Sequence, residues 1–279
     1  MKDGRPNILL TNDDGIQSPG LWAAAKALSR LGYVAVVAPR QQSSGMGRSL
    51  PVTSDGIIEP QQLRIGDQEW PVYAVGGSPA QAVLHGLLEI LPVKPDLVVS
   101  GINYGENLGE GISASGTVGA ALEGASLGIP AIAVSLELAD VGEYLSYSQQ
   151  IDFSTAAYFT QYFARTMLEQ RMPTDVDLLK IDVPVHATPQ TPWRITRLSR
   201  RRYFQPMPHK EPRNWAEPKS IAYGIDESLR QDSNDTDTYT LIVDHLVSVT
   251  PISLDMTSRV DPRDLDHLLR VSASEIVQD

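Results

Sequence analysis

The sequence contains no cysteine among its 279 residues. Disulfide bonds, zinc sites built from thiolates and a cysteine nucleophile are therefore excluded, while a reducing compartment is permitted. No apolar run approaches the ~18 consecutive residues that a membrane-spanning helix needs, and the first residues do not form a recognisable secretory signal. These absences lead us to expect a cytoplasmic protein with no membrane partner.

Basic residues are also fewer than acidic ones. The chain carries 23 Lys and Arg against 34 Asp and Glu, which gives a net charge of −11. Such a surface does not attract the nucleic-acid backbone, so no nucleic-acid partner is expected. One basic cluster, RITRLSRRRYF at 194–204, is local. It fits a solvated turn or a subunit contact, with attraction of a phosphate group as the alternative.

Apolar runs alternate with helical patterns through the first half of the chain. Strands separated by helices indicate a parallel sheet that is covered on both faces. The fold class that we predict is therefore α/β, a Rossmann-like doubly wound and mainly parallel sheet. The expected strands span 7–11, 33–39, 96–103, 130–136 and 176–184, with short strands within 51–75, and the expected helices span 19–32, 78–91, 115–128 and about 149–170.

The pattern changes near residue 185 to Pro-rich and polar connections. We predict a Rossmann-like catalytic core over 1–184 and, over 185–279, a β-hairpin arm with a C-terminal helix that belongs to the same domain. An arm without a core of its own is expected to pack on the main sheet or on a second subunit. The β candidates in this part span 194–199, 220–224, 238–243 and 246–252, and the C-terminal helix is expected over 261–276.

Three polar, Gly-rich loops follow strands of the first half, at 11–20, 41–49 and 100–117. In a doubly wound sheet such loops meet at the carboxyl edge of the strands, where ligands bind. The first loop contains the adjacent carboxylates Asp13 and Asp14, which repel one another. With hydroxyl and amide oxygens from the other loops, they would form a site for Mg²⁺ or Mn²⁺. The alternative is an ordinary turn with a helix cap.

A second feature of these loops is the run Ser115-Gly116-Thr117, which lies where a helix is expected to begin. The N–H groups at a helix start can hold a phosphate, although an ordinary N-cap is the alternative. The chain has neither the Gly-Lys-Ser/Thr of a Walker loop nor a Gly-x-Gly-x-x-Gly after its first strand. P-loop ATP hydrolysis and nicotinamide-dependent chemistry are therefore not supported.

Five segments occur in an order and spacing that match one known family: ILLTNDDGIQSPG, VVAP followed by SSG, PDLVVSGINYGENLG, SGTVGAALEG and DHLVSVTPISLDMT. Over about residues 7–257 the chain resembles the SurE family, stationary-phase survival proteins that act as metal-dependent nucleotide phosphatases. The resemblance implies one divalent metal ion per subunit, Mg²⁺ or Mn²⁺. Its ligands would be Asp13, Asp14, Ser44 and Asn103, with Ser43 as the alternative serine.

The resemblance also implies contacts to the substrate. Phosphate contacts are expected from Asn12 and from the turn formed by Ser115, Gly116 and Thr117, while Asn107 is expected to line the pocket. Members of the family typically form dimers that exchange C-terminal elements, and often tetramers. A homodimer or homotetramer built through the C-terminal arm is therefore expected.

Two positions outside the four predicted metal ligands differ from the pattern of the family. Arg40 follows VVAP where the family often has Asp, and Gln81 stands in the Asp place of a GTP-x-D pattern. These departures bear on the preference for a base or sugar more than on the reaction. Asp237 and His245 lie in a region that resembles the family's subunit interface, where they could tie strands or loops together.

The function implied is a phosphomonoesterase that hydrolyses nucleoside monophosphates, at the 5′ or 3′ position, with exopolyphosphatase activity as a possible side reaction. The carboxylates Asp13 and Asp14 are the catalytic candidates. Water activated by the metal is the favoured nucleophile, and covalent attack by Asp13 is the alternative. Two rival functions are a magnesium-binding phospho-signalling protein and a non-catalytic assembly protein. A dehalogenase-type enzyme would need Asp-x-Asp, whereas these aspartates are adjacent.

Overall fold

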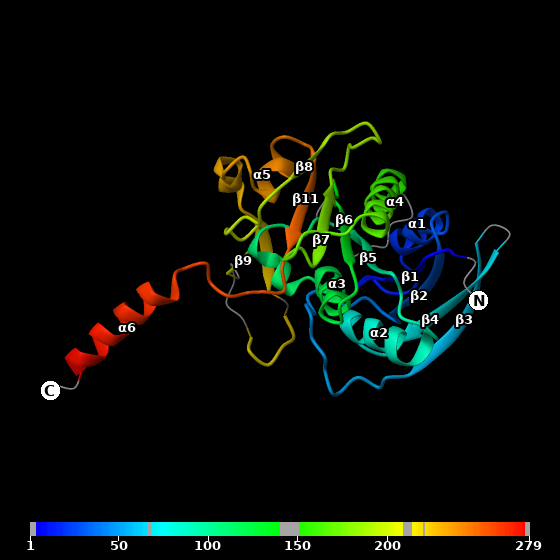
Figure 1. Ribbon diagram of the computed structural model, residues 1–279, viewed down its shortest axis with the longest axis horizontal. Helices are drawn as coiled ribbons and strands as arrows, with labels where there is room; N and C mark the ends of the chain where they lie inside the picture. Colours follow the sequence, from blue (N-terminus) through cyan, green and yellow to red (C-terminus); the bar gives the residue numbers. More distant parts are fainter. Residues whose placement is uncertain (1–3, 66–67, 140–150, 209–213, 220, 277–279) are drawn as a thin grey trace.

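A nine-stranded sheet forms the centre of the protein (Figure 1), which we describe from a computed structural model covering residues 4–65, 68–139, 151–208, 214–219 and 221–276. The strand order is β3-β4-β2-β1-β5-β6-β7-β11-β8. The strands are β1 (Asn7–Thr11), β2 (Tyr33–Pro39), β3 (Ile58–Ile65), β4 (Gln68–Val75), β5 (Leu97–Tyr104), β6 (Ala131–Leu136), β7 (Leu178–Val183), β8 (Trp193–Ile195) and β11 (Val247–Ile252).

The sheet is parallel from β4 to β7 and has an antiparallel pairing on either side of that block. β3 pairs antiparallel with β4, and β11 pairs antiparallel with β7. β1 lies between β2 and β5, parallel to both. In this arrangement the loops after β1, β2 and β5 leave the sheet at the same edge.

Helices cover both faces of the sheet because its central strands are apolar on both sides. Ile8 and Leu10 of β1 pack with α1 (Pro19–Leu28) and α4 (Ser154–Glu169). Leu9, which points to the other face, packs with α2 (Pro79–His85) and α3 (Gly116–Ser126). The alternation along a single strand therefore produces two hydrophobic layers, as expected for a doubly wound sheet. The predicted fold class is confirmed.

The second half of the chain adds to this sheet and also builds a small hairpin. β8 and β11, which both follow residue 184, join the main sheet, whereas β9 (Phe204–Met207) and β10 (Ala222–Ile225) form a separate antiparallel pair. The division at residue 184 stays a prediction. Short helical turns complete the structure at Gly86–Ile90, Glu110–Ala114 and Glu227–Gln231.

One expected strand is wrong. The segment 238–243 forms a helix, α5 (Asp237–Ile242), in place of a strand. Thr236 caps this helix by accepting a hydrogen bond from the N–H of Tyr239, and Leu241 is buried. The β-branched residues of the segment favour a strand, but the cap and this burial outweigh that preference.

The last helix, α6 (Pro262–Ile276), extends away from the body of the molecule in Figure 1. Leu265, Leu268 and Leu269 on this helix are 47%, 64% and 63% exposed. Within the described ranges, the helices are too short or too polar to cross a membrane.

Candidate active site

The chain turns sharply at the end of β1, and a buried asparagine holds the turn. The amide nitrogen of Asn12 donates to the carbonyl of Gly15 (3.1 Å), and the N–H of Gly15 donates to the amide oxygen of Asn12 (3.2 Å). Gly15 has a φ of +94°, a conformation that glycine adopts without a steric penalty. Asn12 therefore shapes the loop that presents the two aspartates, and its contact with phosphate stays a prediction.

Asp13 lies against the N-terminus of α3. Its carboxylate accepts hydrogen bonds from the hydroxyl of Thr117 and from the N–H groups of Gly116 and Thr117. A Cβ atom on Gly116 would lie 2.7 Å from the Cβ of Asp13, so only glycine allows this approach. Ser115 caps the helix by accepting from the N–H of Val118 at 3.1 Å. The structure thus brings together the two features predicted from separate loops.

Asp14 faces the end of β5. One oxygen of its carboxylate accepts from the N–H of Tyr104 at 3.1 Å, and the side chain of Gln42 also hydrogen-bonds to it. Neither of these two partners was among the residues predicted for the site. Gln42 could have been predicted from its position in the polar loop 41–49. The backbone N–H of Tyr104 could not, because every residue except proline has one and the sequence does not mark which of them will donate.

Asn103 precedes Tyr104 at the end of the same strand. Its amide nitrogen donates to the carbonyl of Tyr104 (3.2 Å) and to that of Gly105 (2.7 Å). Because both hydrogen bonds use the nitrogen, the oxygen of the amide is the atom that can serve as a ligand. This orientation suits a cation, and the role of Asn103 as a ligand stays a prediction.

Burial makes the aspartate pair electrostatically costly. Asp13 is 5% exposed and Asp14 is 2% exposed. Burial raises the pKa of Asp13, although the hydrogen bonds from Thr117 and the helix oppose this. Burial and then the charge of Asp13 raise the pKa of Asp14 well above its ordinary value. A divalent cation would relieve both effects, because it compensates for lost hydration and for the repulsion.

The donor set at this edge fits a hard cation. Two carboxylates and the amide oxygen of Asn103 are the oxygen ligands that Mg²⁺ and Mn²⁺ prefer. Across the part of the chain that the structure describes, no group of three or more His, Cys, Asp or Glu side chains could hold a metal ion. A metal at this site would therefore depend on neutral oxygens in addition to the aspartates.

The loop 41–49 is fastened to both Asp13 and α3. The N–H of Ser43 donates to the backbone oxygen of Asp13 at 2.7 Å, and the guanidinium of Arg48 bonds to Glu123 of α3 at 2.6 Å. The hydroxyl of Ser43 already donates to the carbonyl of Gln41, whereas Ser44 is exposed. The structure thus places the loop beside the aspartates, and the choice of Ser44 as a ligand stays a prediction.

Asn107 is held by the strands beneath it. Its amide nitrogen donates to the hydroxyl of Ser135 at 2.9 Å, and its backbone N–H donates to Asp182 at 2.8 Å. These contacts fix the loop that follows Asn103. Its predicted contact with a substrate stays a prediction.

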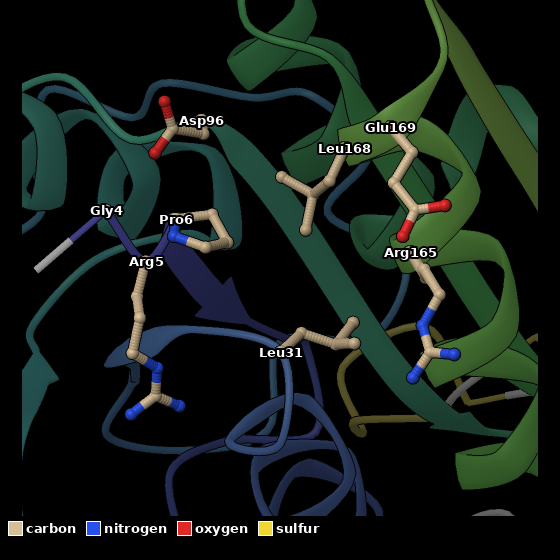
Figure 2. A pocket seen from close by; sticks show the side chains of 8 residues that line it. All are labelled: Gly4, Arg5, Pro6, Leu31, Asp96, Arg165, Leu168 and Glu169. Atoms are coloured by element: carbon tan, nitrogen blue, oxygen red, sulfur yellow. The ribbon is translucent and has the colours of Figure 1, made fainter.

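A separate cavity of about 450 Å³ lies at the opposite edge of the sheet, where β1 and β5 begin (Figure 2). The guanidinium of Arg5 donates there to the carbonyl of Ser29 at 2.8 Å and lies over the ring of Tyr33. Ligands of doubly wound sheets bind at the carboxyl edge, so this cavity is not the candidate site. Its lining residues are Gly4, Arg5, Pro6, Leu31, Asp96, Arg165, Leu168 and Glu169.

Comparison with known proteins identifies the family. A family profile described as Survival protein SurE matches residues 8–205. The chain belongs to the SurE family. A 5'-nucleotidase SurE from Methanosarcina mazei is 40% identical over 270 residues, which cover 95% of this chain and 98% of that protein. A 5'-nucleotidase SurE from Thermococcus gammatolerans is 44% identical over 268 residues, covering 94% and 95%.

A solved SurE structure supports the same assignment. The crystal structure of the SurE protein from Aquifex aeolicus matches with a TM-score of 0.71 and 35% sequence identity, covering 91% of this chain and 95% of that one. The resemblance inferred from the strand-end motifs is therefore confirmed over nearly the whole chain.

Two positions that depart from the SurE pattern have structural partners. Arg40 forms ion pairs with Asp55 and, at 2.7 Å, with Glu59. Gln81 completes a capping box at the start of α2, in which its side chain accepts from the N–H of Ser78 at 3.0 Å. Both residues therefore stabilise the segment between β2 and α2, and neither is among the predicted metal ligands.

Proposed function

We propose that the chain is a divalent-metal-dependent nucleotidase that hydrolyses the phosphomonoester of nucleoside monophosphates. The observation that carries this proposal is the buried pair Asp13 and Asp14 beside Asn103, at the helix end formed by Ser115–Thr117. The 5'-nucleotidase names of its SurE relatives support the same substrate class. We include 3′-nucleotides and short polyphosphate as further candidate substrates.

We propose that Asp13, Asp14, Ser44 and Asn103 hold one Mg²⁺ or Mn²⁺ ion per subunit. The burial of two adjacent carboxylates supports this, because a cation compensates for their lost hydration and their mutual repulsion. Such an ion, when bound, supplies positive charge against the phosphate oxygens and lowers the pKa of a water ligand.

The chain's own groups orient the phosphate. The N–H groups of Gly116 and Thr117 and the hydroxyl of Thr117 already bind an anion in this structure, the carboxylate of Asp13. Because Asp13 occupies these donors here, we assign them to the non-bridging oxygens of a phosphate group with the carboxylate of Asp13 turned toward the metal. Ser115 fixes the helix end, and we assign Asn12 and Asn107 to the remaining contacts with the substrate.

Water is the nucleophile that we favour, with one of the two aspartates positioning it. Covalent attack by Asp13 is the alternative. The configuration at phosphorus separates the two, since a single in-line attack by water inverts it, whereas transfer to Asp13 followed by hydrolysis of the phosphoaspartate retains it. Retention of configuration, or a trapped phosphoaspartate, would overturn our choice.

We also propose that the protein is a cytoplasmic homodimer or homotetramer joined through its C-terminal arm. The exposed leucines of α6 support an oligomer, because apolar side chains on a projecting helix favour a partner surface.

The test of the function is phosphate release from a panel of nucleoside 5′- and 3′-monophosphates with Mn²⁺, Mg²⁺ or EDTA. We expect release that requires the metal and that is lost in Asp13→Asn. The matched control is Asp96→Asn, the same substitution at the opposite edge of the sheet, where the side chain accepts from the N–H of Asn7. No metal-dependent release from the wild type would favour a non-catalytic assembly protein or a signalling protein instead.

A further inference from the structure

A lysine lies at the centre of β7 with no exposure to solvent. Lys180 is 0% exposed, and the strand around it is buried at every position. Taking an ammonium group out of water is expensive unless its charge is compensated and each N–H finds an acceptor. A residue of this kind in a strand core therefore requires specific partners.

Lys180 has three such partners. Its ammonium group forms ion pairs with Asp182 and, at 3.1 Å, with Asp237, and it donates to the carbonyl of Asn107 at 2.7 Å. Both carboxylates are also 0% exposed. Burial lowers the pKa of Lys180, but the two carboxylates outweigh this and the pKa is raised. The group is therefore a buried ammonium with all three donors used.

The two carboxylates also hold the loop that follows β5. Asp182 accepts from the N–H of Asn107 at 2.8 Å, and Asp237 accepts from the N–H of Gly109 at 2.9 Å. Lys180 binds the carbonyl of Asn107, so the N–H and the carbonyl of that residue are both hydrogen-bonded to buried charged side chains. The loop 105–109 is thus fixed from beneath by residues of β7 and α5.

This loop in turn orients Asn103. The amide nitrogen of Asn103 donates to the carbonyl of Gly105 at 2.7 Å, and the N–H of Gly105 donates to the carbonyl of Leu136 at 2.9 Å. A displacement of the loop at Gly105 would therefore remove the shorter of the two hydrogen bonds made by the side-chain nitrogen of Asn103 and leave only the 3.2 Å bond to the carbonyl of Tyr104.

We propose that Lys180 is a positioning residue, which holds the loop 105–109 through Asn107 and so presents the oxygen of Asn103 to the metal. The effect on metal binding rests on the proposed function, whereas the effect of Lys180 on the position of the loop does not. Lys180 touches neither the metal nor the substrate, and it acts through the backbone of the loop alone.

The test compares Lys180→Met with Ile181→Ala. Ile181 is the neighbouring residue of the same strand, equally buried but packed in the core on the opposite face. Both variants remove buried contacts from β7, but only the first removes a bond to the loop. The readouts are hydrogen exchange of the N–H groups of Asn107 and Gly109, Mn²⁺ affinity by calorimetry, and kcat and KM for a nucleoside monophosphate.

We expect Lys180→Met to speed exchange at Asn107 and Gly109 by about tenfold or more relative to Ile181→Ala, since the carbonyl of Asn107 loses its donor and the two carboxylates lose the ammonium that fixes their positions. Mn²⁺ affinity should fall by about tenfold, the usual effect of losing a residue that orients a ligand. Wild-type protection of both N–H groups, or an equal loss of affinity in Ile181→Ala, would overturn the proposal.

Lys180→Met leaves two buried carboxylates without a counter-charge and can prevent folding. The double variant Lys180→Met/Asp182→Asn removes one charge of each sign, and the new amide oxygen at position 182 can still accept from the N–H of Asn107. It should fold and still show faster exchange at Gly109, whose acceptor Asp237 has lost the ammonium; wild-type protection there would contradict the proposal. If wild-type protein binds no Mn²⁺, the metal role fails with the proposed function, while the exchange data still decide the loop role.

Discussion

The carboxylate of Asp13 accepts a hydrogen bond from the hydroxyl of Thr117, 104 positions later in the chain. This bond joins the loop after β1 to the first turn of α3. Asp13, a predicted metal ligand, and Thr117, a predicted phosphate contact, are therefore in direct contact. A change at either residue should therefore affect both functions of the site.

Thr117→Val removes the hydroxyl but keeps the shape of the side chain. We expect a loss of about tenfold to a hundredfold in Mn²⁺ affinity or kcat/KM, as when an outer partner of a metal ligand is removed. The measurement is calorimetry with Mn²⁺ together with steady-state kinetics on a nucleoside monophosphate. Thr117→Ser keeps the donor and should stay close to wild type; an equal loss in both variants would point to packing instead.

Gly116→Ala places a methyl group against Asp13. Since its Cβ would lie 2.7 Å from the Cβ of Asp13, we expect a loss of about 1–3 kcal/mol in the free energy of unfolding, together with lower activity. The matched control is Gly111→Ala, because a Cβ at that position would meet no other segment among the described residues within 4 Å. Urea unfolding checks the prediction, and similar values for the two variants would contradict it.

Metal binding should stabilise the protein through the aspartate pair. A ligand at a hundredfold excess over its Kd stabilises the folded state by about 2.7 kcal/mol. Mn²⁺ should therefore raise the Tm of the wild type but not that of Asp13→Asn/Asp14→Asn, and EDTA should reverse the rise. Thermal scans with and without Mn²⁺ decide this, and an unchanged Tm in the wild type would count against a metal site here.

The pH dependence of the metal-free protein should reflect Asp14. Its pKa in the folded protein is raised above the ordinary value of 3.8, so the folded state keeps its proton over a range where the unfolded state has lost it. The stability that this group contributes is therefore complete below pH 3.8 and is lost as the pH rises through the raised pKa. Asp14→Asn cannot ionise and avoids that loss.

In EDTA, the Tm of Asp14→Asn minus that of the wild type should increase between about pH 4 and pH 8, because only the wild type becomes charged at this position. Thermal scans at several pH values measure the difference. A constant difference, or one equal to that of the control Asp96→Asn, would show that the raised pKa has no effect on stability.

The proposed oligomer should depend on α6. Removal of residues 262–279 deletes the exposed leucines of this helix, and we expect the mass measured by light scattering to fall to a smaller assembly or a monomer. Leu265→Ser/Leu269→Ser is a milder variant that keeps the helix length. An unchanged mass in both would place the subunit contact elsewhere.

Local signals in the sequence were sufficient to place the aspartates and the helix start of the candidate site. The position of Asp13 and Asp14 after an apolar strand, and that of Ser115–Thr117 at a helix start, follow from strand and helix ends that the sequence marks clearly. That the two groups meet follows from the order of parallel strands, so their proximity was also predictable.

Contacts between distant segments were not predictable in the same way. Lys180 lies within an apolar run, and its partners come from the loop after β5 and from α5. The segment that forms α5 was expected to be a strand, because Thr, Tyr, Ile and Val favour strands and the helical cap at Thr236 is a weaker local signal. Tertiary packing decided both cases, and a single sequence carries no direct record of it.

The place of β11 in the sheet has a consequence for the order in which the protein is assembled during its synthesis. β8 leaves the ribosome before β11, yet its partner in the sheet is β11, which lies between it and β7. β1, which precedes Asp13, can pair with β5, which carries Asn103, as soon as residue 104 has emerged, whereas β8 has to wait until residue 252. We therefore expect a nascent chain to form its aspartate turn early, with the far edge of the sheet and the compensation of Lys180 by Asp237 completed last.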